Sequence, residues 1–309
     1  MKYIIAAGTH MDEVHLADGT VSINQGGCGM YAMVGLRVFT KDVFPISGVE
    51  DDFLERYGDW YAENNIPTAG LTQRLDFHGK TVITYFQDGS RIDRPTVGLE
   101  KNRTRNATIA EVEQFCGTDT AGVYTFHNFD PPYIEGLIRL RKERKFKLLW
   151  EIAADAAQPE YLTGIEQYCR DVDVFSINME EAKTLMATEN EEAILDTFRR
   201  KFGCWVFLRE GSKGAYMITP EDCVHCPSVP NTPVVDPTGG GNSSSGAVLY
   251  AYCQGDSPLL AGIKGSVAAA RIIAQFGPPA SYPEGSIQQA EYDSLILYQR
   301  CLHGEFDRT

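Results

Sequence analysis

The sequence is short of positive charge and lacks a long apolar run. It has 28 Lys and Arg residues against 42 Asp and Glu residues, a formal net charge of −14. A protein whose main partner is nucleic acid needs a cationic surface to displace counterions, so this balance argues against a nucleic-acid ligand. The apolar run at residues 3–7 is far shorter than the roughly 20 residues that cross a bilayer. We therefore expect a small-molecule ligand, no membrane contact, and a buried first strand.

Cysteines are scattered along the chain, and of the eight only Cys223 and Cys226 stand close together. A structural zinc site needs four ligands, and no second pair of Cys or His residues has the spacing of a zinc finger or ribbon. A chain of 309 residues with 43% hydrophobic residues can bury a core without disulfides or metal ions. We expect reduced thiols near a strand and a cytoplasmic protein, with a redox or metal role for the pair as the alternative.

Short apolar segments alternate with amphipathic ones along most of the chain, which is typical of βαβ units around a parallel sheet. Strands are expected at residues 3–6, 123–126, 147–151, 172–177, 204–208, 215–218 and 234–236. Helices are expected at residues 132–144, 159–170, 190–202, 241–253 and 259–275. The sequence thus predicts one α/β domain over residues 1–309, in which residues 292–309 form an extra helix and a tail.

Two segments break this pattern. Residues 77–92 contain the alternating run Thr-Val-Ile-Thr-Tyr-Phe and a turn at Asp-Gly-Ser. Residues 13–23 also do not follow the alternation of apolar and amphipathic segments. Strands of this kind pair in an antiparallel sheet. We therefore expect a small antiparallel β lid formed by about residues 13–25 and 75–98, and an apolar face on it would favour a homodimer.

A glycine turn occupies residues 236–242, with the sequence Asp-Pro-Thr-Gly-Gly-Gly-Asn. It is followed by a small and apolar run that is typical of a helix. Glycines lack a Cβ, so successive backbone N–H groups can converge on an anion, and the start of the helix adds partial positive charge. The natural ligand for such a turn is a phosphate. A flexible loop that contains three glycines by chance is the alternative.

This turn resembles the second signature of the ribokinase-like (PfkB) carbohydrate kinases, in which Thr-Gly-Ala-Gly-Asp leads into a helix. In that family the glycines form an anion hole for the γ-phosphoryl group, and the closing Asp accepts the proton of the attacking hydroxyl. The resemblance assigns catalysis to four positions: Gly239, Gly240, Gly241 and Asn242. An amide cannot accept a proton at neutral pH, and general-base catalysis contributes about 10²- to 10⁴-fold. Phosphoryl transfer depends mostly on positioning and charge neutralisation, so slow activity is compatible with Asn242.

Further segments match the family in the expected order over about residues 1–290. Asn178 and Glu181 open a helix, where they form a capping-box pattern, and the family places a Glu there that holds the water shell of Mg²⁺. The hairpin at residues 210–215 resembles the loop beside the nucleotide. The resemblance assigns the nucleotide to Asn178, Glu181, Arg209, Gly211, Gly214 and Thr238.

The acceptor side is expected near the N-terminus. Residues 7–12 resemble the family's first strand end, whose Asp accepts hydrogen bonds from sugar hydroxyls, and residues 25–33 resemble its first signature. The resemblance assigns the acceptor to Asp12, Gly26, Gly27 and Tyr31, with a phenol at the last position where the family has Asn. The residues that would hold a monovalent cation, K⁺ in the family, are Asp236, Thr238, Gly277 and Ser281.

These matches predict a ribokinase-like three-layer α/β/α sandwich with a mostly parallel sheet and a β lid. The implied function is an ATP-dependent phosphotransferase that uses Mg²⁺ and acts on a hydroxymethyl group of a sugar or nucleoside-like acceptor. A catalytically silent nucleotide-binding or regulatory protein on the same fold is the alternative, because Asn242, Tyr31 and Ser244 depart from the family pattern.

Overall fold

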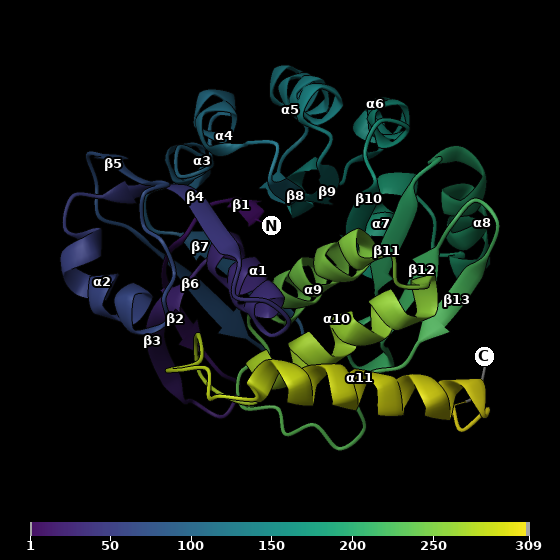
Figure 1. The fold of residues 1–309 in the computed structure, drawn as a ribbon. Coiled ribbons are helices and arrows are strands. Elements are labelled where there is room, and N and C mark those ends of the chain that lie inside the picture. The colour runs from purple at the N-terminus through teal and green to yellow at the C-terminus, as the bar shows by residue number, and fades with distance from the viewer. Residues whose placement is uncertain (1, 307–309) are drawn as a thin grey trace.

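The computed structural model describes residues 2–306, and its largest feature is a nine-stranded sheet (Figure 1). Its strands are β1 (Lys2–Ala6), β4 (Val43–Glu50), β5 (Leu71–Leu75), β8 (Thr120–His127), β9 (Lys147–Ile152), β10 (Val174–Asn178), β11 (Trp205–Arg209), β12 (Ala215–Ile218) and β13 (Cys223–Cys226). Their order is β13-β12-β11-β10-β9-β8-β1-β4-β5. Neighbours pair in parallel except at β11–β12 and β12–β13. The prediction of a mostly parallel sheet is confirmed.

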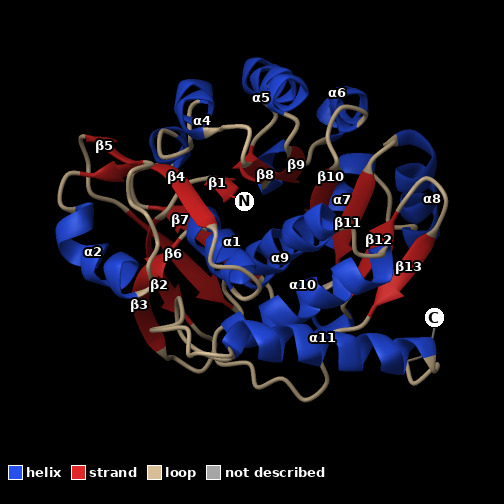
Figure 2. Ribbon diagram, viewed as in Figure 1, coloured by secondary structure: helices blue, strands red, loops and turns tan. Residues whose placement is uncertain are grey.

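Helices cover both faces of this sheet and complete the predicted three layers (Figure 2). One core cluster packs the sheet against α4 (Ile109–Phe115), α5 (Pro131–Arg144), α6 (Leu162–Cys169), α7 (Met179–Met186) and α8 (Glu191–Lys201). A second cluster packs the opposite face against α1 (Cys28–Arg37), α2 (Phe53–Glu63), α9 (Gly240–Gln254) and α10 (Pro258–Ile272). Short helices lie at α3 (Leu99–Arg103), η1 (Ala154–Ala156), η2 (Pro159–Tyr161) and η3 (Gly211–Lys213).

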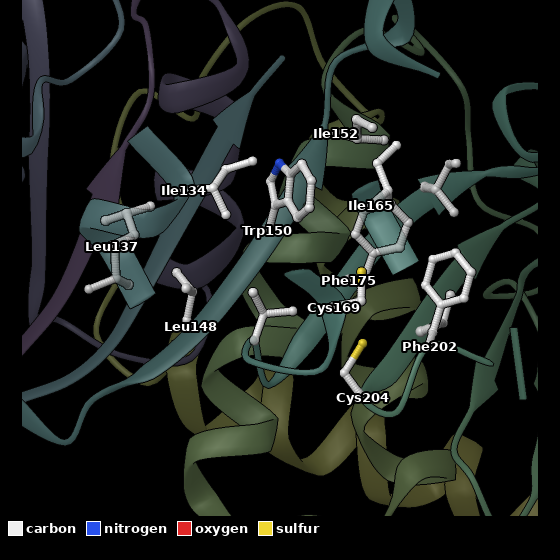
Figure 3. Close-up of a cluster of buried hydrophobic side chains, with 14 of the residues drawn as sticks. Ile134, Leu137, Leu148, Trp150, Ile152, Ile165, Cys169, Phe175, Phe202 and Cys204 are labelled. Atoms are coloured by element: carbon white, nitrogen blue, oxygen red, sulfur yellow. The ribbon is translucent and has the colours of Figure 1, made fainter. Parts of the chain in front are cut away.

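Alternation along β9 decides which side chains face which layer. Trp150 is buried in the first cluster, where its ring centroid lies 5.3 Å from that of Phe175 on β10 (Figure 3). Successive side chains of a strand point to opposite faces, so Glu151 points to the side that α9 covers. A carboxylate is thereby buried in the sheet at the carboxyl end of β9, where it is 1% exposed.

The second sheet is formed by the two segments predicted as a lid. It contains β2 (His10–His15), β3 (Val21–Gly26), β6 (Lys80–Tyr85) and β7 (Arg91–Pro95), in the order β3-β2-β6-β7. The β2–β3 and β6–β7 pairs are antiparallel hairpins, and the two hairpins join through a parallel β2–β6 pair. The central pair is parallel because β2 continues from β1 and β6 from β5, which run in the same direction in the main sheet.

Several expected elements begin or end a few residues away from their predicted bounds, and two differences are larger. The strand predicted at residues 234–236 is absent: the N–H groups of Val235 and Asp236 both donate to the carbonyl of Ile273 at the end of α10, so this segment is an extended loop held by a helix. The last helix, α11 (Ser286–Leu302), begins before residue 292 and packs along α10 through Ala290. Within residues 2–306 no helix has the length and apolar composition to span a membrane.

Candidate active site

The glycine turn joins the extended loop to α9. The N–H of Thr238 donates to Asp236 Oδ1 at 2.9 Å, which tightens the turn. Gly239 follows with φ of 81°, a left-handed conformation that favours glycine. α9 begins at Gly240, so the unpaired N–H groups of its first turn and the positive end of its dipole face the same space. This is the arrangement that binds a phosphate group.

Sterics explain why glycine is needed at residue 239, and they show how closely a cation approaches residue 241. A Cβ atom on Gly239 would overlap the ring of Tyr31, and a Cβ atom on Gly241 would overlap the guanidinium of Arg209. An aromatic ring from α1 and a cation from β11 therefore lie directly against the turn. The three glycines are therefore not a flexible loop. They are packed against these two side chains, and they form the start of α9.

Asn242 lies in the first turn of α9, and its amide meets a carboxylate. Its Nδ2 donates to Glu151 Oε1 at 3.0 Å and to the hydroxyl oxygen of Tyr124 at 3.3 Å. The Tyr124 hydroxyl in turn donates to Glu151 Oε2 at 2.9 Å. Burial, and secondly the charge of Glu151, raise the pKa of Tyr124 far above its usual value, so the phenol stays a donor.

Arg209 connects this carboxylate with a second one. Its Nη1 lies 2.9 Å from Glu151 Oε1, and its Nη2 lies 3.9 Å from Glu181 Oε2. Glu181 also closes the predicted capping box of α7: Asn178 Oδ1 accepts from the N–H of Glu181 at 2.8 Å, and Glu181 Oε2 accepts from the N–H of Asn178 at 3.0 Å. Burial raises the pKa of Glu181, and the charge of Arg209 offsets part of that rise.

One cavity of about 1040 Å³ runs past the three glycines, Asn242, Glu151, Arg209 and Glu181. At one end it is lined by Gly211 and Gly214 of the turn before β12, by the loop at residues 228–232, and by Ala269 of α10. At the other end it is lined by Asp12, Gly27 and Tyr31. The glycine turn lies between the two ends, so the predicted nucleotide and acceptor residues share a single space.

The acceptor end is organised around Asp12 on β2, which is 2% exposed. Its Oδ2 accepts from the N–H of Gly27 at 3.0 Å, and its Oδ1 lies 3.1 Å from His10 Nε2. The same His10 nitrogen is 2.9 Å from the hydroxyl oxygen of Thr81 on β6. A Cβ atom on Gly26 would overlap the carboxylate of Asp12, which explains the need for glycine there. The lid strands therefore position the carboxylate directly.

Tyr31 forms part of the wall between the two ends of the cavity. Its ring packs on Gly239, and its hydroxyl is buried without a hydrogen-bond partner among the residues that the structure describes. Burial, and secondly the charge of Asp12, raise the pKa of this phenol well above its usual value. A neutral hydroxyl that lines the cavity is therefore free to bond a ligand.

The lid also contacts the glycine turn. The Tyr85 hydroxyl on β6 lies 3.1 Å from Thr238 Oγ1. Arg91 on β7 donates from Nη1 to the same Tyr85 hydroxyl at 3.3 Å and pairs with Asp93 at 3.2 Å. A cation and a phenol of the lid thus lie over the edge of the predicted phosphate site.

Comparison with known proteins identifies the family to which the chain belongs. A family model for pfkB family carbohydrate kinases matches residues 1–284, which end just before α11. The chain belongs to this family. It is therefore a kinase by family, on the ribokinase-like fold that the sequence predicted.

Individual relatives of this pfkB kinase are distant in sequence. An uncharacterized protein of Schizosaccharomyces pombe is 24% identical over 87% of this chain and 83% of its own length. The structure of a probable sugar kinase from Rhizobium etli superposes with a TM-score of 0.75, at 17% identity over 96% of this chain and 99% of that one. A Burkholderia thailandensis nucleoside kinase, in complex with ADP-inosine, gives a TM-score of 0.75 at 15% identity over 96% of both chains. These structures share the fold.

Two of the residues expected to hold a monovalent cation in this pfkB kinase, Asp236 and Thr238, lie together at the glycine turn. Asp236 is 1% exposed, its Oδ2 has no hydrogen-bond partner within residues 2–306, and burial raises its pKa. Thr238 lies beside it. Gly277 packs against Asn24 of the lid, and Ser281 is exposed. The unpaired oxygen fits a cation at Asp236, and the roles of Gly277 and Ser281 stay a prediction.

The cysteine pair of this pfkB kinase lies on β13, where it cannot form a shared metal site. Residues three apart in a strand point to opposite faces. Cys226 is buried in the cluster beneath α10, with its thiol 3.7 Å from the carbonyl oxygen of Leu259, and Cys223 packs on the opposite cluster. Both are free thiols that fill space beside a strand.

Sequence reasoning missed four residues of this site: Tyr85, Arg91, Tyr124 and Glu151. A signal existed for Glu151, which interrupts the otherwise apolar run Leu-Leu-Trp-Glu-Ile in a predicted strand. A charge is rarely buried there without a partner. The partner, Arg209, is on another strand and was predicted as a nucleotide ligand, so the pairing was not visible in the sequence.

Proposed function

We propose that this chain transfers the terminal phosphoryl group of ATP to a hydroxymethyl group of a sugar or nucleoside-like acceptor. The observation that carries the proposal is the single cavity in which the glycine turn lies between Gly211 and Glu181 on one side and Asp12 and Tyr31 on the other. A phosphoryl donor and a hydroxyl acceptor that occupy the two ends meet at the turn. Holding two reactants in this way supplies much of the rate of phosphoryl transfer.

The chemistry of each end supports its ligand. Backbone N–H groups at the start of α9, together with Arg209, neutralise phosphoryl oxygens. At the other end, the carboxylate of Asp12 accepts hydrogen bonds from vicinal hydroxyls, and the phenol of Tyr31 offers another polar contact. Contacts from Thr81 and Tyr85 join the lid to both ends, so closure of the lid would exclude water from the reacting groups.

Two cations fit the residues present. Glu181 offers a partly buried carboxylate beside the glycine turn, which suits the water shell of Mg²⁺, and Asp236 offers the unpaired oxygen described above for K⁺. Mg²⁺, when bound, neutralises charge on the nucleotide phosphates. The side chains orient the two reactants: Arg209 faces the phosphoryl group, and Asp12 holds the acceptor.

The cellular setting follows the same reasoning. The eight free cysteines and the charge of −14 support a cytoplasmic protein whose partner is a small molecule rather than nucleic acid or a membrane. Val21 and Ile23, on the edge strand of the lid, are 53% and 57% exposed and support a homodimer through that edge. Sedimentation of the purified protein before and after Ile23→Lys tests the dimer, which the variant should dissociate.

A binding screen followed by a turnover screen tests the activity. Melting is measured with Mg-ATP and with pentoses, hexoses and nucleosides, because a ligand that binds the folded state raises the melting point by mass action. Each ligand that shifts the melting point is then assayed for ADP release and for its phosphorylated product. Shifts with turnover support the proposal. Shifts without turnover, in both wild type and Asn242→Asp, would support the silent binding protein instead.

A further inference from the structure

Several carboxylates line the cavity, and one of them contacts residue 242. Glu151 receives a hydrogen bond from Asn242 at 3.0 Å, and it lies between the glycine turn and the sheet. Asp12 also lines the cavity, but its Oδ2 accepts from the N–H of Gly27. Asp236 does not line the cavity, and its Oδ1 accepts from the N–H of Thr238. The carboxylate that the family carries on α9 is thus matched here by one that β9 presents to the same place.

We propose that Glu151 accepts the proton of the attacking hydroxyl, and this inference rests on the proposed phosphotransferase function. The acceptor oxygen forms a bond to the γ-phosphorus while its O–H bond breaks and the proton moves to a Glu151 oxygen. The bond from the γ-phosphorus to the bridging oxygen breaks, and the electron pair leaves with ADP. Asn242 orients the carboxylate and the hydroxyl without taking the proton. The protonated Glu151 then returns its proton to water after the product leaves.

Arg209 couples this proton acceptor to the nucleotide. Its Nη1 lies 2.9 Å from Glu151 Oε1, and the same guanidinium lies against Gly241 at the glycine turn. A phosphoryl group at the turn offers several charged oxygens in a geometry that suits a guanidinium, so it competes for Arg209. Glu151 Oε1 is then released toward the acceptor, while the hydroxyl of Tyr124 keeps Oε2 in place. The proton acceptor becomes available when the donor is bound.

The experiment compares four proteins: wild type, Glu151→Gln, Asn242→Asp and the double variant. Each is assayed with Mg-ATP and ribose, fructose, adenosine and inosine over a range of pH. Glu151→Gln should lower kcat by about 10²- to 10⁴-fold, as expected for loss of a general base, with little change in KM for ATP. The decline of the wild-type rate toward acid pH should disappear in this variant. Adding Asn242→Asp to Glu151→Gln should raise kcat at least about 10-fold above that of Glu151→Gln alone, because it returns a carboxylate to the site.

Asp173→Asn is the matched control for the loss of a buried, paired carboxylate. Asp173 is 6% exposed and pairs with Arg141 at 2.6 Å, but it precedes β10 at the opposite end of the sheet from Glu151. It should lower the melting point and leave kcat unchanged. Three results would overturn the assignment and leave Glu151 as a structural residue. The loss of activity in Glu151→Gln could match its loss of melting temperature, its rate could still decline toward acid pH, or Asn242→Asp could fail to raise its kcat.

The remaining outcomes separate the inference from the proposed function. A kcat in Glu151→Gln equal to that of wild type overturns the role of Glu151 and leaves the phosphotransferase intact. Turnover in Asn242→Asp alone shows that wild type has no working proton acceptor, which also overturns the inference. No turnover in any of the four proteins removes the proposed function, and the inference fails with it.

Discussion

The half of the cavity at the glycine turn presents mainly backbone groups with Arg209 beside them, and the half at Asp12 presents mainly side chains. At the glycine turn, the binding groups are N–H groups of a helix start, and Gly239 and Gly241 are fixed by the atoms packed against them. At the acceptor end, Asp12, His10 and Thr81 come from two strands of the lid and hold one another. Substitutions change backbone N–H groups little, so a site built from them can bind the phosphoryl group of any donor. A site built from side chains can be changed by substitution to suit a particular acceptor.

Among the variants that test this comparison, Gly239→Ala should have the largest effect. The new Cβ atom meets the Tyr31 ring, and the left-handed φ of 81° costs an alanine about 1–2 kcal/mol. Displaced N–H groups at the turn should lower kcat by about 100- to 1000-fold, the usual loss when an oxyanion donor is removed. Steady-state kinetics and melting curves measure the two effects.

Gly255→Ala is the control for that variant. Gly255 caps the other end of α9 with a φ of 79°, and a Cβ atom there meets nothing within 4 Å. It should cost similar backbone strain and leave kcat at the wild-type value. Equal losses of activity in the two variants would show that the turn contributes only stability.

Asp12→Asn tests the acceptor half. Hydrogen bonds to a charged group contribute about 1.5–3 kcal/mol, so kcat/KM for the acceptor should fall about 10- to 100-fold while KM for ATP is unchanged. Asp18→Asn, in the exposed turn between β2 and β3, removes a carboxylate from the same hairpin and should have no effect. A parallel rise in KM for ATP would contradict the separation of the two halves.

Tyr85→Phe tests the contact between the lid and the turn. It removes the hydroxyl that lies 3.1 Å from Thr238 Oγ1 and 3.3 Å from Arg91 Nη1. A net hydrogen bond contributes about 0.5–1.5 kcal/mol, so KM for ATP should rise about 2- to 10-fold. Tyr292→Phe, on the exposed side of α11, is the control and should match wild type.

The smallest effect is a pH-dependent change in stability at Glu181. Burial raises its folded-state pKa above the ordinary 4.5, so folding penalises its charged form, and the penalty grows as pH rises through that window. Glu181→Gln keeps an oxygen for the N–H of Asn178 and removes the charge. It should gain up to about 1 kcal/mol in free energy of unfolding at about pH 8 and nothing at about pH 4.

Glu111→Gln should show the opposite sign at the same position of another helix. Glu111 closes the capping box of α4, and although burial raises its pKa, the N–H of Thr108 and the charge of Arg74 outweigh that and hold the pKa below 4.5. Its stabilising contribution is present above that value and is lost as pH falls. The variant should therefore be less stable than wild type at about pH 8, by urea unfolding. Changes of the same sign in both variants would contradict the burial effect at Glu181.

Local patterns could be predicted from the sequence, and long-range partners could not. The capping box at Asn178 and Glu181 and the start of α9 depend on neighbours in the chain, so both were predicted correctly. The prediction of a strand at residues 234–236 was wrong. Two adjacent valines suggested pairing in a sheet, whereas the N–H groups of Val235 and Asp236 donate to the carbonyl of Ile273 at the end of α10. The contact of Glu151 with Arg209 and Asn242 joins three distant elements, and no local pattern encodes it.

The most direct test of the account is the fate of a labelled γ-phosphoryl group. Wild-type protein is incubated with Mg-ATP labelled at the γ-phosphorus and with each acceptor that raises its melting point. The account predicts that the label moves to a hydroxymethyl oxygen of at least one acceptor, that Gly239→Ala slows the transfer about 100- to 1000-fold, and that Gly255→Ala preserves it. Label that stays on ATP with every bound acceptor, or moves only to water, would contradict it.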